Sequence, residues 1–229
     1  MSTRDAPADT RMMGIVHSAL KRDLLRTRVV LATSPPPQGR QRRALGEHVT
    51  WMMEFLHAHH RGEDLGLWPL VRERNPAAAD LLDSLEADHA RIDPAARAAA
   101  AAAGEYTATT TDPPREALAE ALDQLLTVLV PHLDREVDDG MPVVAASITA
   151  REWDAIEQEY NIKPKSLPQL GIEGHWLLED IDAEGYDVVV HKVPPVARFV
   201  LVHGFARAYR RQARARWTPD TARRRAAAR

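Results

Sequence analysis

Six side chains with metal-binding groups recur along the chain at spacings that helices can bring together. They are four histidines and two glutamates: His17, His59, Glu63, His89, His132 and Glu136. Four of the six form two His-x-x-x-Glu pairs, and a separation of four residues puts both members of a pair on one helix face. Two such pairs and two further histidines could hold two metal ions, because each ion can take two imidazoles while the carboxylates bridge them. Mixed imidazole and carboxylate ligands suit iron, and also manganese or zinc.

The composition narrows the chemistry further. The chain has no cysteine, which excludes disulfides, zinc–thiolate sites, iron–sulfur clusters and cysteine nucleophiles. Any bound metal must therefore be held by His, Asp and Glu. The 229 residues, of which 45% are hydrophobic, suffice for one domain with a full core and an appendage.

The four histidines stand at matching distances from the expected turns. Three clusters of helix-breaking residues, at 34–39, 75–76 and 109–114, divide the first 147 residues into four segments. The midpoint between His17 and His59 is position 38, that between His59 and His89 is 74, and that between His89 and His132 is 110.5. Each midpoint falls in or beside a breaker cluster, and in an antiparallel helix hairpin residues equidistant from the turn lie at one level. We therefore predict that one up-down-up-down bundle brings the four histidines into one layer.

The apolar spacing of the four segments also predicts an all-α four-helix bundle. Apolar residues recur at alternating steps of three and four, as in Leu118, Leu122, Leu125 and Leu129, and the histidines and glutamates continue these rows. Ionisable residues thus occupy positions where the pattern expects core leucine. Burying a histidine or carboxylate without a partner raises the free energy of the folded chain. We therefore expect the six residues to share a common partner.

The chain changes character after about residue 147, and we divide it into a bundle over residues 1–147 and an appendage over residues 148–229. A Thr149–Glu152 capping box opens a short helix. The segments 176–181 and 186–193 could pair as a small β-hairpin. A basic helix should then run to about Trp217, followed by a tail.

Charge is distributed unevenly along the chain. The net charge is −3, but residues 198–229 contain ten arginines and one acid, Asp220. We expect a solvated basic tail; weak binding to nucleic acid, anionic lipid or an acidic partner is the alternative, although no nucleic-acid motif supports it. The first residues lack the apolar core of a signal peptide, and residues 193–206 are too short and too polar for a membrane span. We therefore expect a soluble cytoplasmic protein.

Several other polar residues compete for a place in the site. His60 and Asp64 are an alternative inward-facing pair for the second segment. The helix face that contains them is more polar than the face that contains His59 and Glu63, so we favour His59 and Glu63 as the site residues. We then expect His60 to flank the site, either at the surface or behind a ligand. We expect His48 and His57 to be exposed. Asp93, just before a proline, could ligate metal or bond His89, but more often such a residue caps a kink. The remaining histidines lie in the appendage without paired carboxylates and are expected to be structural: His175, His191 and His203.

The order His, His-x-x-x-Glu, His, His-x-x-x-Glu resembles the hemerythrin-like, HHE cation-binding family over about residues 9–147. Three local phrases carry the resemblance: His59-His60-Arg-Gly-Glu63-Asp64-Leu-Gly-Leu-Trp68-Pro69, Asp88-His89 and His132-Leu-Asp-Arg-Glu136. The resemblance implies a non-haem di-iron site, with two iron ions joined by an oxo or hydroxo bridge.

The sequence also departs from part of that family. Oxygen-carrying hemerythrins have a fifth histidine in a His-x-x-x-His on the third helix, whereas Leu85 stands four residues before His89 here. The set of four histidines and two glutamates is instead similar to iron-centre repair proteins and to the iron-sensing F-box hemerythrin domain. Their Cys-containing N-terminal domain and F-box are missing from this sequence, so neither role transfers.

Two functions fit the expected site. The first is a redox-active di-iron protein that reacts with dioxygen, peroxide or nitric oxide in oxidative or nitrosative stress, including catalase-like turnover. The second is an iron or oxygen sensing module without turnover, which signals through the appendage to a protein partner or a second copy. Simple oxygen storage is disfavoured by the missing fifth histidine.

Overall fold

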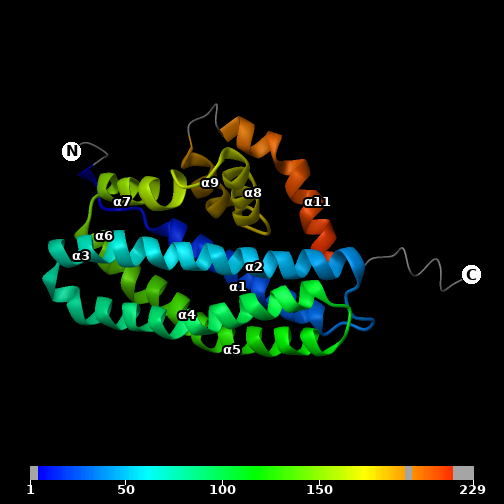
Figure 1. Cartoon of the computed structure of the whole chain (residues 1–229). Helices are drawn as coiled ribbons and strands as arrows, with labels where there is room; N and C mark the ends of the chain where they lie inside the picture. Colours follow the sequence, from blue (N-terminus) through cyan, green and yellow to red (C-terminus); the bar gives the residue numbers. More distant parts are fainter. Residues whose placement is uncertain (1–4, 194–197, 219–229) are drawn as a thin grey trace, which may run out of the picture.

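The computed structural model describes residues 5–193 and 198–218, and these residues fold into helices arranged as a bundle with a smaller helical layer on one side (Figure 1). The four long helices are α1 (Arg11–Leu31), α2 (Gly39–Gly62), α4 (Ala79–Ala108) and α5 (Pro113–Arg135). Helix α2 packs along α4, α4 along α5, and α5 along α1. The expected all-α four-helix bundle is confirmed.

Two apolar cores fill the bundle, one on each side of the histidine layer. One contains Leu20, Leu56, Ile92 and Leu129, and the other contains residues nearer the opposite end: Met13, Leu67, Leu85 and Met141. On every helix the site residues fall between a residue of the first core and a residue of the second. The polar layer is therefore enclosed by hydrocarbon along the bundle axis.

Both helices that carry a His-x-x-x-Glu pair widen into a π-helical turn at the glutamate. The segment Glu63–Leu67 leads into α3 (Trp68–Arg74), and Glu136–Gly140 leads into α6 (Met141–Ser147). The amide of Trp68 donates to the carbonyl of Glu63, five residues earlier, and the second turn repeats this bond. A proline stands six residues after each glutamate. Proline lacks an N–H and collides with the carbonyl four residues before it, so a wider turn lets the helix continue.

The appendage lies along α1 and α2 (Figure 1). Its helices are α7 (Ala150–Ile156), α8 (Leu167–Leu177), α9 (Ala183–His191) and α11 (Ala206–Trp217), with π-helical segments at Glu157–Ile162 and Val200–Gly204. The predicted capping box at Thr149 is present, with the Glu152 carboxylate accepting from the Thr149 amide at 2.9 Å. Within the described residues, no helix has the length and apolar character needed to cross a membrane.

The prediction of a β-hairpin in the appendage is wrong. The segment 186–193 lies mostly in α9, whereas 176–181 consists of the last two residues of α8 and the turn that follows; the described residues contain one isolated β-bridge, Pro7–Thr149. Local capping explains the difference. Asp182 accepts a hydrogen bond from the Gly185 amide at 2.7 Å and starts α9, and a Ser166–Gln169 capping box starts α8. Side-chain caps of this kind override the strand preference of the Val188–Val190 run.

A buried polar network joins the appendage to the bundle. The carboxylate of Asp23 in α1 accepts hydrogen bonds from His48 Nε2 at 2.7 Å, Trp176 Nε1 at 3.0 Å and Arg22 Nε at 2.9 Å. Burial opposes ionisation, but the bonds from His48 and Arg22 hold the pKa of Asp23 at about 2. The expectation that His48 is exposed is therefore wrong, because α8 and α11 cover this side of α2.

Candidate metal centre

All six predicted residues point into one buried layer of the bundle. Helices α1, α2, α4 and α5 each contribute one histidine, and each glutamate is the first residue of a π-helical turn. None of the six residues is more than 9% exposed. The structure thus brings together the whole set: His17, His59, Glu63, His89, His132 and Glu136.

The four histidines form two pairs, and each of the two carboxylates lies between one pair and the other. His17 Nε2 and His59 Nε2 lie 3.2 Å apart, and the rings of His89 and His132 meet edge to face at 4.8 Å. One oxygen of Glu63 lies 3.0 Å from His59 Nε2, and its other oxygen lies 3.6 Å from His89 Nε2. Glu136 Oε2 lies 3.5 Å from both His17 Nε2 and His132 Nε2. Each carboxylate therefore contacts one histidine of each pair.

The buried polar atoms of this layer test whether the residues fit a metal. Both oxygens of Glu63, both oxygens of Glu136, and Nε2 of His89 and His132 are buried without a hydrogen-bond partner among the described residues. Leaving such groups unpaired costs about 1–3 kcal/mol each, and more when they are charged. Lone pairs that converge from imidazoles and carboxylates are the donor set of divalent metal sites. The residues fit metal ions better than they fit a network closed on itself.

Outer hydrogen bonds fix the orientation of two of the four histidines, His17 and His89. His89 Nδ1 donates to Asp64 Oδ1 at 2.7 Å, and His17 Nδ1 donates to the carbonyl of Leu133 at 3.0 Å. In both rings the lone pair is then left on Nε2, which faces the carboxylates. Such partners set the tautomer and raise the basicity of metal-binding histidines. Asp93 does not orient a histidine of the layer in this way, because its carboxylate pairs with Arg97.

Burial favours the neutral forms of three histidines and both glutamates of the layer when no cation is bound. It lowers the pKa of His17 to about 4 and that of His132 to about 3, and it lowers the pKa of His59 well below 6.5. The pKa of Glu63 is raised by burial and by the nearby Glu136 carboxylate, and burial also raises that of Glu136. Neutral imidazoles are ready to bind metal, whereas the carboxyl groups must release protons to do so.

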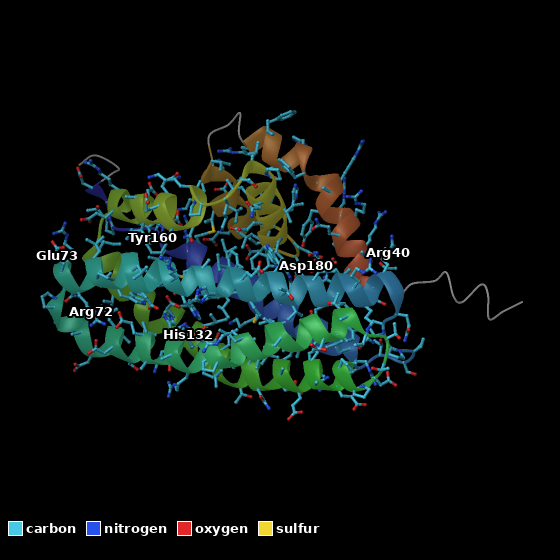
Figure 2. All side chains as sticks on the ribbon, in the orientation of Figure 1. Arg40, Arg72, Glu73, His132, Tyr160 and Asp180 are labelled. Atoms are coloured by element: carbon cyan, nitrogen blue, oxygen red, sulfur yellow. The ribbon has the colours of Figure 1, made fainter. Side chains whose placement is uncertain are left out.

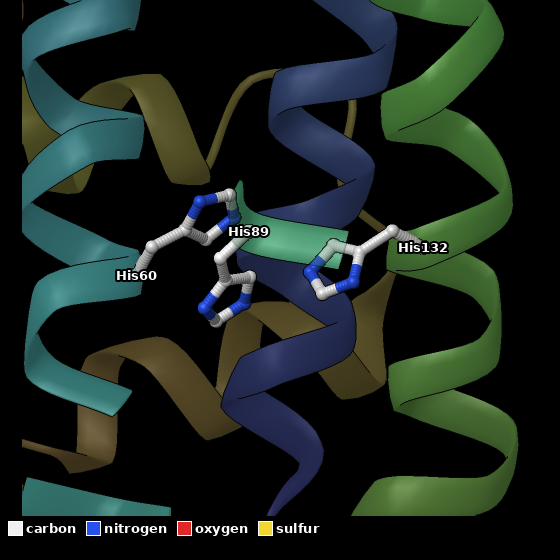
Figure 3. A group of neighbouring side chains, drawn as sticks. All are labelled: His60, His89 and His132. Carbon is white, nitrogen blue, oxygen red and sulfur yellow. The ribbon is translucent and has the colours of Figure 1, made fainter. Parts of the chain in front are cut away.

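Another buried histidine, His60, lies against the layer (Figure 3). Its ring stacks on His89 at 4.0 Å with an interplanar angle of 8°, and it meets the edge of His132 at 5.3 Å. Nitrogens of His60, His89 and His132 all lie within 4.8 Å of one another. Of the two positions expected for His60, the one at the surface is wrong, since only 7% of the residue is exposed, and the stacking on His89 agrees with the one behind a predicted ligand. His57, by contrast, is exposed as expected.

A cavity of about 130 Å³ lies beside the His17, His59 and Glu63 side of the layer. Apolar residues from both the bundle and the appendage line it, among them Met12, Val16, Trp153, Ile156 and Leu177. Two ion pairs also line it, Lys165–Glu173 and Lys192–Glu157. The cavity thus connects side chains of the histidine and glutamate layer with the appendage.

Tyr160 brings the appendage close to the π-helical turn that contains Glu63 (Figure 2). A Cβ atom added at Gly66 would lie 2.5 Å from the Tyr160 ring, and one at Gly62 would lie 3.1 Å from Tyr160 Cβ. The Tyr160 hydroxyl donates to the carbonyl of Leu65 at 3.3 Å. The two glycines allow an approach that side chains at these positions would prevent.

Comparison with known proteins agrees with this geometry. The family model for the hemerythrin HHE cation binding domain matches residues 10–143. No curated protein and no solved structure matches the chain. The family match covers more than half of the sequence and contains every residue of the buried histidine and glutamate layer. The chain therefore belongs to the hemerythrin HHE cation-binding domain family.

Proposed function

We propose that this protein is a non-haem di-iron protein that reacts with dioxygen, peroxide or nitric oxide. The six residues of the layer would bind two iron ions, with His17 and His59 at one ion and His89 and His132 at the other. The observation that carries the proposal is that Glu63 and Glu136 each lie between the two histidine pairs, as bridging carboxylates must. Bound iron would supply electrons and Lewis acidity to a small ligand.

The cavity beside His59 and Glu63 supports a small, uncharged ligand. Its volume of about 130 Å³ is below the range of about 300–1,000 Å³ typical of pockets for organic ligands. Its lining is mostly apolar, which disfavours charged substrates. Dioxygen, nitric oxide and hydrogen peroxide meet both conditions, and turnover of peroxide would need no pocket for an organic substrate.

The residues around the layer have separate tasks in this function. Asp64 and the Leu133 carbonyl hold the two imidazoles in place, and the two apolar cores keep bulk water out along the bundle axis. The glutamates, whose pKa values are raised, would release protons as metal binds. They could bind a proton again when the positive charge of the bound metal ions decreases.

Three measurements on the full-length chain test the proposal. After expression with iron, metal analysis should give two irons per chain, and the optical spectrum should contain an oxo-bridge charge-transfer band. Added peroxide should be consumed over many turnovers. A matched Glu136→Gln variant should lose iron and turnover together, whereas Glu120→Gln on the exposed part of α5 should keep both. A preparation that holds only zinc, or no metal, after growth in iron would overturn the proposal.

A sensing function without turnover is the second candidate. It is favoured by the shared cavity, because residues of α7 and α8 line the same space as His59 and Glu63. Iron or ligand at the site would then change the packing of the appendage. Metal-dependent melting without peroxide turnover, together with loss of a protein partner when residues 148–229 are deleted, would favour sensing over catalysis.

A further inference from the structure

A second, larger cavity lies away from the metal centre, where three helices meet. It has a volume of about 570 Å³ and is formed by α2, α8 and α11. In Figure 2, Arg40 lies where the end of α11 approaches α2. This cavity shares no lining residue with the cavity beside His59, so its ligand need not be the ligand of the iron site.

The charge of this cavity is strongly positive. Four arginines line it and face a single acid, Glu47; they are Arg40, Arg43, Arg211 and Arg216. Within residues 5–193 and 198–218, the side chains of Arg40, Arg43 and Arg211 make no ion pair or hydrogen bond. The nearby carboxylates are already satisfied, since Asp23 accepts from His48 and Trp176, and Glu179 accepts from Arg26 and Tyr209. The positive charge of the cavity is therefore left for a ligand.

Arg216 gives this cavity a buried and incompletely bonded guanidinium. Only 5% of the residue is exposed, yet its Nε and Nη2 have no hydrogen-bond partner among the described residues. Its guanidinium lies 5.5 Å from the Tyr209 ring and 5.6 Å from the Trp217 ring, and neither contact provides an acceptor oxygen for Nε or Nη2. Burial lowers the pKa of Arg216 from its usual value. A buried guanidinium is costly unless an anion accepts its hydrogen bonds.

The remaining wall of the cavity is aromatic and apolar. Trp51, Trp176 and Tyr209 line it together with Ile172. Trp51 stacks on His48 and meets Trp176 edge to face at 5.0 Å, so these rings are held in place. Fixed rings suit a planar apolar group, and the arginine fork suits a phosphate or carboxylate. The volume lies within the range of about 300–1,000 Å³ that small organic ligands occupy.

We propose that the cavity between α2, α8 and α11 binds a small organic anion that carries a phosphate or carboxylate on an aromatic ring. The arginines hold the anionic group, with Arg216 at the buried side, while Trp51 and Tyr209 contact the ring. Because α11 and α8 supply half of the site, ligand binding fixes these appendage helices against α2. The appendage thus serves as a ligand-binding module on a metal-binding bundle.

Calorimetry with the full-length chain at about 150 mM NaCl, which screens general charge attraction, tests this proposal. The probes are phenyl phosphate, inorganic phosphate and phenol. We expect phenyl phosphate to bind once per chain and to quench tryptophan fluorescence, inorganic phosphate to bind more weakly, and phenol not to bind. Equal affinity for phenyl phosphate and inorganic phosphate would overturn the assignment of the aromatic wall.

Matched arginine variants separate a defined site from general basicity. The exposed pair Arg43→Gln with Arg211→Gln should weaken phenyl phosphate binding about tenfold or more, because charge-assisted hydrogen bonds are lost. The control Arg210→Gln changes an exposed arginine of α11 that does not line the cavity, and it should change affinity less than about twofold. The proposal would be overturned if the double variant and the Arg210→Gln control lost the same affinity for phenyl phosphate, or if phenyl phosphate failed to bind the wild-type chain. Tighter binding of duplex DNA with equal dependence on all three arginines would also overturn it and would make this a nucleic-acid surface. Iron content should be unchanged throughout.

Discussion

The carboxylate of Asp64 lies 2.7 Å from Nδ1 of His89 and directs the opposite ring nitrogen toward Glu63. Asp64 is the residue after Glu63, so the π-helical turn that presents the carboxylate to the metal layer also presents its neighbour to His89 from outside. One widened turn thereby supplies an oxygen of the proposed metal site and the partner that orients one of its nitrogens.

In the proposed di-iron site this relationship would make Asp64 a positioning residue. We expect Asp64→Asn to lower iron affinity about 10- to 100-fold, as changes behind metal-binding histidines commonly do. Iron retention during chelator competition measures the effect. Asp93→Asn serves as the control, because Asp93 is bonded to Arg97 and not to His89. If both variants released iron equally fast, the orienting role of Asp64 would be refuted.

His89 and His60 should differ in their effect on iron content, although both are buried. His89→Ala should remove one iron per chain, since it deletes a nitrogen directed at Glu63. His60→Ala should keep two irons per chain, because the six-residue set stays complete, but the loss of its stacking on His89 should hasten iron release. Metal analysis of the purified variants decides this. Loss of one iron from His60→Ala would instead make His60 a ligand.

The metal-free protein should be most stable near pH 6.5. Below that pH, the buried histidines, whose pKa values are lowered, bind fewer protons than in the unfolded chain, so stability rises as pH rises from about 4 to 6.5. The raised pKa values of Glu63 and Glu136 act in the opposite sense. At these two carboxyl groups the folded chain binds more protons than the unfolded chain above pH 4.5, which reduces the gain from the three histidines up to pH 6.5 without cancelling it. Above pH 6.5 the histidines are neutral in both states, so the carboxyl groups act alone and stability falls with rising pH.

Melting temperatures across this pH range, with and without iron, test the argument. Iron binds the ionised glutamates, so the iron-loaded protein should show no decline above pH 6.5. Glu136→Gln should reduce the decline in the metal-free protein. A decline of the same steepness in that variant would show that other groups cause it.

Gly66 and Gly104 should respond oppositely to substitution by alanine. At Gly66 the new methyl group would meet the Tyr160 ring, and we expect a loss of about 1–3 kcal/mol from overpacking between bundle and appendage. At Gly104 nothing lies within 4 Å, so alanine should stabilise α4 by about 0.5–1 kcal/mol. Chemical denaturation measures both changes. Equal stability of the Gly66→Ala and wild-type chains would mean that Tyr160 moves aside freely.

The bundle and the six-residue layer could be predicted because they depend on regular features of the sequence. Helical periodicity fixed which faces were buried, and the turn positions placed the histidines at one level. The burial of His48 and His60 could not be predicted in the same way. Each depends on packing between distant segments: α8 and α11 cover His48, and His60 packs against α4 and α5.

The appendage was harder to predict because local signals there conflict. The Val188–Val190 run favours a strand, whereas the Asp182 cap favours a helix, and the helix forms. The π-helical turns also escaped prediction, although the sequence held a signal for them in the proline six residues after each glutamate. Such a proline disfavours a regular helix, but Pro131 lies inside the regular helix α5, so a proline alone does not distinguish a kink from a widened turn.

The matching prolines and π-helical turns divide the bundle into two equivalent halves. In each half a helix with one histidine is followed, after 42 residues in the first and 43 in the second, by a His-x-x-x-Glu pair, a widened turn and a proline. Neither half would complete the proposed metal site alone, since each carboxylate contacts a histidine of the other half. Iron would therefore be retained only by chains in which the two helical hairpins are packed in the correct register.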